Sequence, residues 1–428
     1  MKLWDKGYSI EKKIEQFTVG DDRIYDLKLA TYDVEGSRAH ARMLAKQGLI
    51  SNDEIAEIEQ ALDQIQGLIQ SGDFLIEDDF EDVHSKIEYL LTELLGDAGK
   101  RIHTARSRND QVLVDLHLFF KDELRDITEL VKNLFDRLML LADQHKEIII
   151  PGYTHMQVAM PSSFGLWFSS YAETLIDDIY FLRAAQHIAD QNPLGSAAGY
   201  GSSFPIDRSM TTRELGFSTM KYNVVAAQMG RGKLERSVAM AMASVASTIA
   251  RMAMDVCLYN SQNFGFLSFP DELTTGSSIM PHKKNPDVWE LIRGRCNRIQ
   301  AAPTEITMLT NNLPSGYHRE YQLLKESIFP SIDSLKACLD MAEYMLQHVI
   351  INKNAANDER YRYMYTVENV NEEVMKGATF RDAYKTVGKQ VGDGTYKPIS
   401  NLSHTHEGSI GNLCLKEIRE KMNSALSS

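Results

Sequence analysis

The feature that most limits how this chain can fold is a long run of helical periodicity that ends near His145. The run follows the polar segment 103–111, and its apolar residues recur at helical spacing without a break. At a rise of about 1.5 Å per residue, such a helix is ~50 Å long, which exceeds what a small globular domain needs. A helix of this length predicts a bundle that is shared between subunits.

Helical patterns also dominate the rest of the 428 residues. Ser51 and Glu54 have the spacing of a capping box at the start of one helix. We expect helices near 31–47, 52–70, 81–95, 162–191, 232–264, 288–312 and 326–351, with a long loop over 192–207. We therefore predict an all-α fold with three domains: an N-terminal helical domain (1–105), a central long-helix bundle (106–351) and a small C-terminal helical domain with an irregular tail (352–428).

The composition excludes several classes of partner. A net charge of -13 argues against nonspecific binding to nucleic acid or to an anionic membrane surface, because both need a positive surface. The most apolar segment, 237–259, contains Arg251 and Asp255, which are costly in lipid, so we interpret it as a buried core helix. The first residues hold no apolar core of signal-peptide length.

The cysteines and histidines do not form a recognisable metal site. Cys257, Cys296, Cys338 and Cys414 lie far apart without a Cys-x-x-Cys pair, which argues against a disulfide framework and against zinc. His404 and His406 have only Glu407 beside them, so we interpret them as part of a surface loop. We expect no metal, no cofactor and a cytoplasmic location.

The densest chemistry lies in the stretch 276–287, which reads GSSIMPHKKNPD. Its glycine and two prolines exclude helix interior and predict a loop, in which Gly276 allows the serines to move. A helical pattern follows, with Val288, Leu291, Ile292 and Cys296 on one face. Residues 283–285 therefore precede a helix N-terminus, which favours a bound carboxylate.

This loop resembles the signature of the fumarase and aspartase superfamily, and its KKNPD ending resembles argininosuccinate lyases most closely. The resemblance implies that the chain eliminates fumarate from a succinyl compound without a cofactor. Ser277 is then the general base, and Lys283 and Asn285 stabilise the negative charge that develops on the substrate carboxylate. Without the resemblance, a basic turn that solvates a helix end would be the alternative.

Two further segments resemble the same family. The segment HTARSRNDQ (103–111) departs from the family pattern only at Ala105, where a glycine is usual, and implies that Ser107, Arg108 and Asn109 contact the succinyl part. The segment GYTHMQ (152–157) implies substrate binding by Thr154 and proton transfer by His155, with Glu290 as the partner of this histidine. Without the resemblance, the polar residues before the long helix would be interpreted as a solvated charge cluster, His155 as a structural histidine and Glu290 as an exposed carboxylate.

A third group, Tyr317, Gln322 and Lys325, corresponds by resemblance to residues that bind the amino-acid part of the substrate. From composition alone they would be read as a helix surface. The signatures lie far apart in the sequence, so we expect a homotetramer in which each active site draws its signatures from different subunits.

The resemblance implies argininosuccinate as the small-molecule substrate, with arginine and fumarate as products. It weakens at 228–231, where Gln-Met-Gly-Arg replaces a family Ser-Asp-Arg-Asp, and at 5–8, where Asp-Lys-Gly-Tyr replaces Gly-Gly-Arg-Phe. Both departures border the expected substrate site. An N-acylated argininosuccinate, adenylosuccinate, and a noncatalytic role like that of delta-crystallins therefore remain as alternatives.

Overall fold

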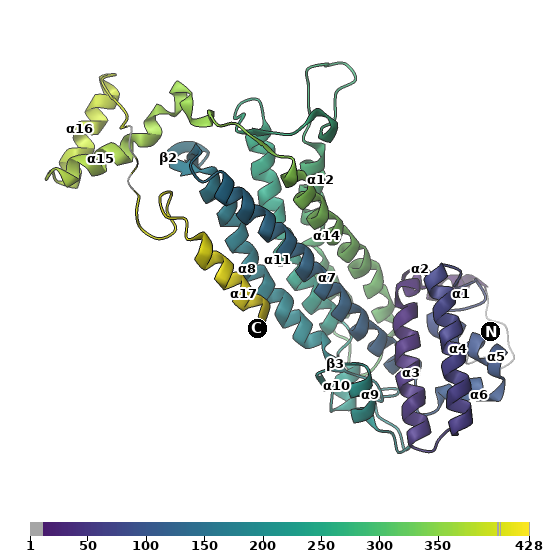
Figure 1. Ribbon diagram of the computed structural model, residues 1–428. Helices are drawn as coiled ribbons and strands as arrows, with labels where there is room; N and C mark the ends of the chain where they lie inside the picture. The colour runs from purple at the N-terminus through teal and green to yellow at the C-terminus, as the bar shows by residue number, and fades with distance from the viewer. Residues whose placement is uncertain (1–11, 400–401, 403, 428) are drawn as a thin grey trace. The chain divides into compact units, whose positions relative to one another are not determined.

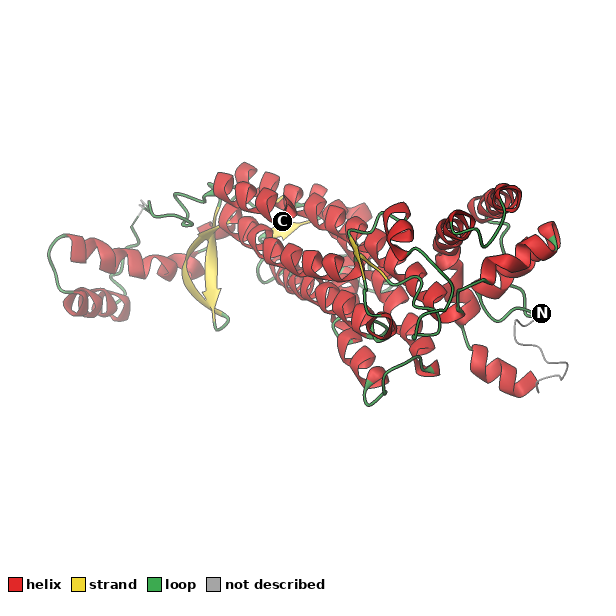
Figure 2. Cartoon of the chain, turned by 90° about the horizontal axis from the view of Figure 1, so that it is seen from below, coloured by secondary structure: helices red, strands yellow, loops and turns green. Residues whose placement is uncertain are grey.

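The computed structural model describes residues 12–399, 402 and 404–427, and helices dominate them (Figures 1 and 2). This confirms the all-α class. The α-helices are α1 (Lys12–Val19), α2 (Asp22–Asp26), α3 (Ala30–Lys46), α4 (Asn52–Ser71), α5 (Val83–Leu95), α6 (Asp97–Lys100), α7 (Arg108–Gln144), α8 (Phe164–Ala189), α9 (Arg208–Glu214), α10 (Val224–Gln228), α11 (Lys233–Asn260), α12 (Asp287–Ile299), α13 (Ala302–Thr310), α14 (Leu324–Gln347), α15 (Thr366–Met375), α16 (Phe380–Gly392) and α17 (Leu415–Ser427).

Short 3-10 helices and strands connect these helices. The 3-10 helices are η1 (Leu27–Leu29), η2 (Arg101–His103), η3 (Asp271–Leu273), η4 (Arg319–Leu323), η5 (Ala355–Asn357) and η6 (Glu359–Tyr365). The strands are β1 (Ile149–Thr154), β2 (Gln157–Ser163), β3 (Gln191–Asn192), β4 (Thr219–Met220), β5 (Leu267–Ser268) and β6 (Ile350–Ile351). They form three two-stranded pairs: β1 and β2 are antiparallel, β3 and β4 parallel, and β5 and β6 antiparallel.

The chain divides into two compact units, each built from three segments. Unit 1 comprises Met1–Thr128, Phe181–Ser244 and Arg298–Leu335, and unit 2 comprises Glu129–Tyr180, Val245–Asn297 and Lys336–Ser428. The long helices α7, α8, α11 and α14 each contribute residues to both units. The division into three domains stays a prediction.

The core of unit 1 is centred on aromatic side chains from three helices. Phe119 and Phe120 of α7 pack against Phe329 of α14, with ring centroids 4.6 and 6.4 Å apart, and Tyr32 of α3 meets Phe119 edge-on. At the start of α4 the predicted capping box is present, because Ser51 and Glu54 satisfy each other's backbone N–H groups.

In unit 2 the long helices pair through polar contacts as well as apolar packing. Asp255 of α11 accepts hydrogen bonds from Trp167 Nε1 (3.1 Å) and the Tyr171 hydroxyl (2.6 Å) of α8. Asp178 of α8 accepts one from Thr248 of α11. The most apolar window of α11 meets the length and composition of a membrane span, but 61% of it is buried inside the protein, as predicted for a core helix.

Three local expectations differ from the structure. Residues 149–163 form a β-hairpin (Figure 2), so α8 begins at Phe164 instead of near 162. The helix expected over 288–312 is broken into α12 and α13, since Pro303 can occupy only the first turn of a helix. Leu291 is 61% exposed, and the buried face of α12 contains Trp289 instead.

The C-terminal region contains α15, α16 and α17, with an irregular segment between the last two. His404 is paired with Glu368 of α15 (2.9 Å), and Lys421 of α17 is paired with Glu173 of α8 (3.0 Å). Cys257, Cys296, Cys338 and Cys414 form no disulfide.

We predict that Asp255→Ala lowers the free energy of unfolding by roughly 2–4 kcal/mol, because two nearly buried donors lose their acceptor. Tyr171→Phe is the matched control, since it removes one donor together with its need for an acceptor, and should cost about 1 kcal/mol. Urea unfolding at fixed protein concentration measures both values. Equal stability of Asp255→Ala and the wild type would contradict the assigned role of this carboxylate.

Candidate active site

The segment before α7 is held in place by hydrogen bonds around the N-cap of the helix. Ser107 precedes the helix, its hydroxyl accepts from Asn109 N–H, and Asp110 accepts from Ser107 N–H at 2.8 Å. Ala105 has a φ of 60°, the left-handed conformation that a glycine adopts more easily. This explains why the related family usually has glycine there. Arg106 is buried and donates to the Ser37 hydroxyl, so it does not face a substrate.

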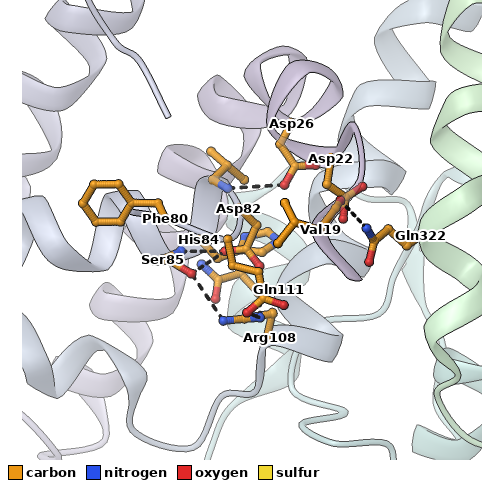
Figure 3. A network of polar contacts seen from close by, with 12 residues as sticks. Val19, Asp22, Asp26, Phe80, Asp82, His84, Ser85, Arg108, Gln111 and Gln322 are labelled. Atoms are coloured by element: carbon orange, nitrogen blue, oxygen red, sulfur yellow. Dashed lines mark hydrogen bonds and ion pairs between the residues drawn. The ribbon is translucent and has the colours of Figure 1, made fainter. Parts of the chain in front are cut away.

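Arg108 is held by acidic and polar groups near the start of α5 (Figure 3). Its guanidinium lies 3.0 Å from Glu81 and 3.2 Å from Asp82, and it donates to the Ser85 hydroxyl at 3.3 Å. Asp82 also caps α5, because it accepts from Ser85 N–H. The arginine is therefore fixed in position by its neighbours.

The third predicted group lies in the same unit and also has internal partners. Lys325 is buried and donates to Asp22 (2.8 Å) and Asp26 (2.5 Å). Gln322 donates to the carbonyl oxygen of Val19 at 2.6 Å. The Tyr317 ring meets that of Tyr321 edge-on. Lys325 is thus bound to two carboxylates of α2.

Arg108, Tyr317, Gln322 and Lys325 line one hollow, which we call the unit 1 hollow. Its cavity volume is about 30 Å³, and it is open to solvent. The other lining residues are Asp22, Asp26, Glu81, Asp82, His84, Val112, Arg231 and Arg319. The lining combines four carboxylates with four cationic Lys and Arg side chains, so it suits a ligand that carries both signs of charge.

The charges in the hollow shift one another's protonation. Burial raises the pKa of Asp82, but His84 and Arg108 together lower it below its usual value. Burial lowers the pKa of His84, and the contact with Asp33 more than reverses this, so the pKa of the imidazole lies above its usual value. Burial raises the pKa of Asp22 to about 6, against the opposing effect of Lys325.

The predicted loop 276–287 lies in unit 2, and a narrow neck closes it. Asn285 N–H donates to the Thr275 carbonyl at 2.8 Å, the Thr275 hydroxyl donates to Asp287, and Lys284 pairs with Asp271. Gly276 does not have the left-handed φ that favours glycine, and a Cβ there would meet nothing within 4 Å. The conformation seen here therefore does not require a glycine at this position, and the mobility of the serines stays a prediction.

Within the loop, Ser277 is partly exposed and its hydroxyl oxygen accepts from two backbone N–H groups, those of Ile279 (3.3 Å) and Met280 (3.1 Å). Such donors stabilise negative charge on the oxygen. Lys283 is exposed, and α12 begins at Asp287, directly after the loop. The predicted relation between residues 283–285 and a helix N-terminus is confirmed.

Thr154 and His155 lie at the end of the β-hairpin, also in unit 2. Thr154 pairs with Gln157 across a two-residue turn, in which His155 and Met156 have φ values of 52° and 58°. Positive φ at both positions is typical of a type I′ turn. The imidazole is exposed. Among the residues that the structure describes, no hydrogen bond or ion pair connects His155 to Glu290, and their pairing stays a prediction.

The structure thus gathers the predicted residues in two groups. Unit 1 contains Ser107, Arg108, Asn109, Tyr317, Gln322 and Lys325, although Ser107 and Asn109 do not line the hollow. Unit 2 contains Thr154, His155, Ser277, Lys283, Asn285 and Glu290. That these residues act together as one active site stays a prediction.

Sequence reasoning missed the carboxylates of the unit 1 hollow. Asp22 and Asp26 lie in a short helix of five residues, which leaves no periodic signal. Glu81 and Asp82 were recognised only as the start of a helix; the clustering of two acids before an apolar run was the available signal. Of the departures noted at 228–231, Arg231 lines the hollow and Gln228 is fully buried outside it. Residues 5–8 lie outside the described residues.

Asp33, His84 and Asp115 form a buried group whose ligand atoms lie close enough to hold a metal ion. The oxygens of Asp33, however, already accept from Ser37, Gln111 and His84. Asp115 has no hydrogen-bond partner among the described residues, and burial together with the charge of Asp33 raises its pKa well above the usual value. The hydrogen bonds that Asp33 already accepts and the raised pKa of Asp115 argue against a metal centre at this group.

Known proteins resemble this chain in sequence over its whole length. A family model described as lyase matches residues 11–301. An argininosuccinate lyase from Parabacteroides distasonis is 52% identical over 427 residues, which cover 100% of this chain and 96% of that protein. The chain therefore belongs to the argininosuccinate lyase family.

Solved structures agree on the fold of this family member. EDDS lyase in complex with formate matches with a TM-score of 0.77 at 21% identity, covering 98% of this chain and 90% of that one. Recombinant class II fumarase from Schistosoma mansoni matches with a TM-score of 0.75 at 16% identity, covering 96% and 95%. The predicted fumarase and aspartase fold is confirmed.

We predict that Asp22→Asn removes a pH dependence of stability. The folded chain holds the Asp22 proton more tightly than the unfolded chain, since the pKa rises from 3.8 to about 6. The protonated Asp22 side chain therefore contributes at most about 3 kcal/mol to the free energy of unfolding. This contribution is complete below pH 4 and is lost as the pH rises through 6. The wild type should lose stability relative to Asp22→Asn across this interval.

Urea unfolding between pH 4 and pH 8 measures the difference. Asp21→Asn is the matched control, because Asp21 is exposed and does not line the hollow. A pH profile for Asp22→Asn that runs parallel to the wild type would show that Asp22 titrates normally.

Proposed function

We propose that this protein catalyses the reversible elimination of fumarate from argininosuccinate, which gives L-arginine. The observation that carries the proposal is the match to argininosuccinate lyases at 52–54% identity over nearly the whole length. The loop 276–287, with its serine, lysine and asparagine before a helix N-terminus, supplies matching chemistry. The protein is then a carbon–nitrogen lyase of arginine biosynthesis, with a cytoplasmic location.

The elimination breaks a C–H bond and a C–N bond of the succinyl part. Ser277 removes the proton from the carbon next to a carboxylate, and the N–H groups of Ile279 and Met280 stabilise the negative charge on its oxygen. Lys283, Asn285 and the N-terminus of α12 stabilise the charge that builds on the substrate carboxylate. His155, or a water that it positions, protonates the departing guanidine nitrogen, with Glu290 as its partner.

The unit 1 hollow is the proposed binding site for the arginine part. A free amino acid carries an ammonium group and a carboxylate, and the hollow offers four carboxylates and four cations. Ser107, Arg108, Asn109 and Thr154 bind the succinyl part, while Tyr317, Gln322 and Lys325 bind the amino-acid part.

We further propose a homotetramer in which each active site combines residues of different subunits. Helices α11, α12, α13 and α14 expose large apolar side chains, which would be covered in a bundle of several chains. They are Met240, Met254, Leu291, Met308 and Met341. A fully active monomer in light scattering would contradict this assembly.

The activity is tested by incubating the purified protein with argininosuccinate, N-acylated argininosuccinate, adenylosuccinate or aspartate, and by following fumarate absorbance. We expect turnover of argininosuccinate in preference to the others. Turnover of another succinyl compound alone would identify a different fumarate-releasing lyase. Silence with all four would favour a structural role, like that of delta-crystallins.

Ser277→Ala should lower kcat by about 10²–10⁴-fold, the contribution of a positioned general base, with the assembly unchanged. Ser278→Ala is the matched control, because it removes a neighbouring exposed hydroxyl on the same loop. Retained turnover in Ser277→Ala would exclude this serine as the base.

A further inference from the structure

A single carboxylate connects the Arg108 segment to a distant loop of unit 1. Asp110 is fully buried, and its two oxygens accept three backbone N–H groups. One oxygen accepts from Ser107 at 2.8 Å, and the other accepts from Gly195 (3.0 Å) and Ala197 (2.9 Å). Gly195 and Ala197, which lie 85 and 87 positions after Asp110 in the sequence, are therefore fixed to the first turn of α7.

The loop is shaped around this carboxylate. Gly195 and Ala197 have φ values of 86° and 52°, so the backbone turns two of its N–H groups toward one point, as in an anion-binding nest. A left-handed conformation is unfavourable for alanine and persists only where the surroundings impose it. The carboxylate of Asp110 is the group toward which both N–H groups are directed.

Gln228 holds the loop from another side, and Tyr200 marks where the loop continues. Gln228 is fully buried and donates to the Ser196 hydroxyl (3.1 Å) and the Ala197 carbonyl (3.2 Å). The loop continues to Tyr200, whose hydroxyl lies 3.8 Å from the point where a side chain on Gly316 would begin. Gly316 directly precedes Tyr317, which lines the unit 1 hollow. The loop therefore runs from the start of α7 to a point beside Gly316, the chain neighbour of Tyr317.

We propose that Asp110 is a positioning residue for substrate binding: it locks the start of α7, whose Arg108 lines the unit 1 hollow, to the loop 195–201, which does not line it, and so makes this wall of the hollow rigid. This inference rests on the proposed function for its kinetic consequences, but the link between the two segments stands on its own contacts. Asp110 itself does not line the hollow and touches no substrate. It acts by holding the helix start that carries Arg108 and the loop that reaches Gly316.

The chemistry of this position requires a carboxylate. An ionised carboxylate only accepts hydrogen bonds, whereas an amide has one accepting oxygen and one donating nitrogen. In Asp110→Asn the amide can serve Gly195 and Ala197, or it can serve Ser107, but its NH₂ group then faces an N–H group on the other side. The substitution preserves size and breaks one of the two connections.

The test compares Asp110→Asn with Asp207→Asn in the full-length protein. Asp207 is the N-cap of α9 at the other end of the same loop region, and asparagine is an equally good cap. We expect Asp110→Asn to raise the KM for argininosuccinate at least tenfold while kcat changes less than threefold, because Ser277 is not attached to this wall. Asp207→Asn should leave both constants unchanged.

Amide hydrogen exchange supplies the second readout and needs no turnover. In Asp110→Asn, exchange should accelerate at Ser107, or at Gly195 and Ala197, and in Asp207→Asn it should not. Unchanged KM together with unchanged exchange would overturn the inference, as would a loss confined to kcat. If the wild type does not turn over argininosuccinate, the proposed function fails, and the exchange result alone decides whether the link exists.

Asp110→Glu keeps the charge and moves the carboxylate by one methylene. This variant replaces Asp110→Asn in the experiment if the asparagine variant does not assemble. We expect a smaller rise in KM in the same direction. Wild-type kinetics in this variant, together with fast exchange at Gly195 and Ala197, would show that the loop connection does not position the site.

Discussion

The arrangement of unit 1 depends on buried ion pairs between segments that are far apart in the sequence. Lys325 binds Asp22 and Asp26, and Arg108 binds Glu81 and Asp82. Removing such charges from water is costly unless each one finds a partner, so neither the acidic nor the basic members could be buried alone. The pairing therefore fixes the first helices of the chain against α7 and α14 and leaves the hollow between them.

This mutual pairing also explains how an acidic protein can bind an anionic group. The net charge of -13 repels anions at long range, but the hollow keeps its cations fixed and partly desolvated. A zwitterionic ligand can exchange partners with the existing pairs, because each of its charges meets a group of opposite sign. The polar side chains are already ordered before a ligand binds, so binding does not carry the free-energy cost of ordering them.

The loop 276–287, unlike the hollow, has few buried contacts. It is fixed at its neck by Thr275, Asn285 and Asp287, while most side chains between them are exposed. A segment with few buried contacts belongs to the low-stability part of a protein, and such segments are the ones that close over substrates. A rigid hollow and a loosely held loop are complementary parts of the proposed lyase mechanism.

Local sequence patterns were sufficient for the elements and for most side chains with a chemical role. The 37-residue helix α7, the capping box at Ser51 and the helix that follows Asn285 depend on neighbouring residues, so periodicity and capping preferences predicted them. The motif residues were recognised because their chemical types recur in the family at fixed spacing. None of these features requires knowledge of which distant segments meet.

Tertiary structure alone decided which charges are paired and which backbone conformations are imposed. The burial of Arg106, the carboxylates around Lys325, the left-handed Ala197 and the type I′ turn at His155 all arise from contacts across long stretches of chain, or from turns whose residues carry no local preference for them. A periodic pattern reports which face of an element is apolar. It contains no information about the partner that the face or the charge will meet, and only the folded chain brings that partner into contact.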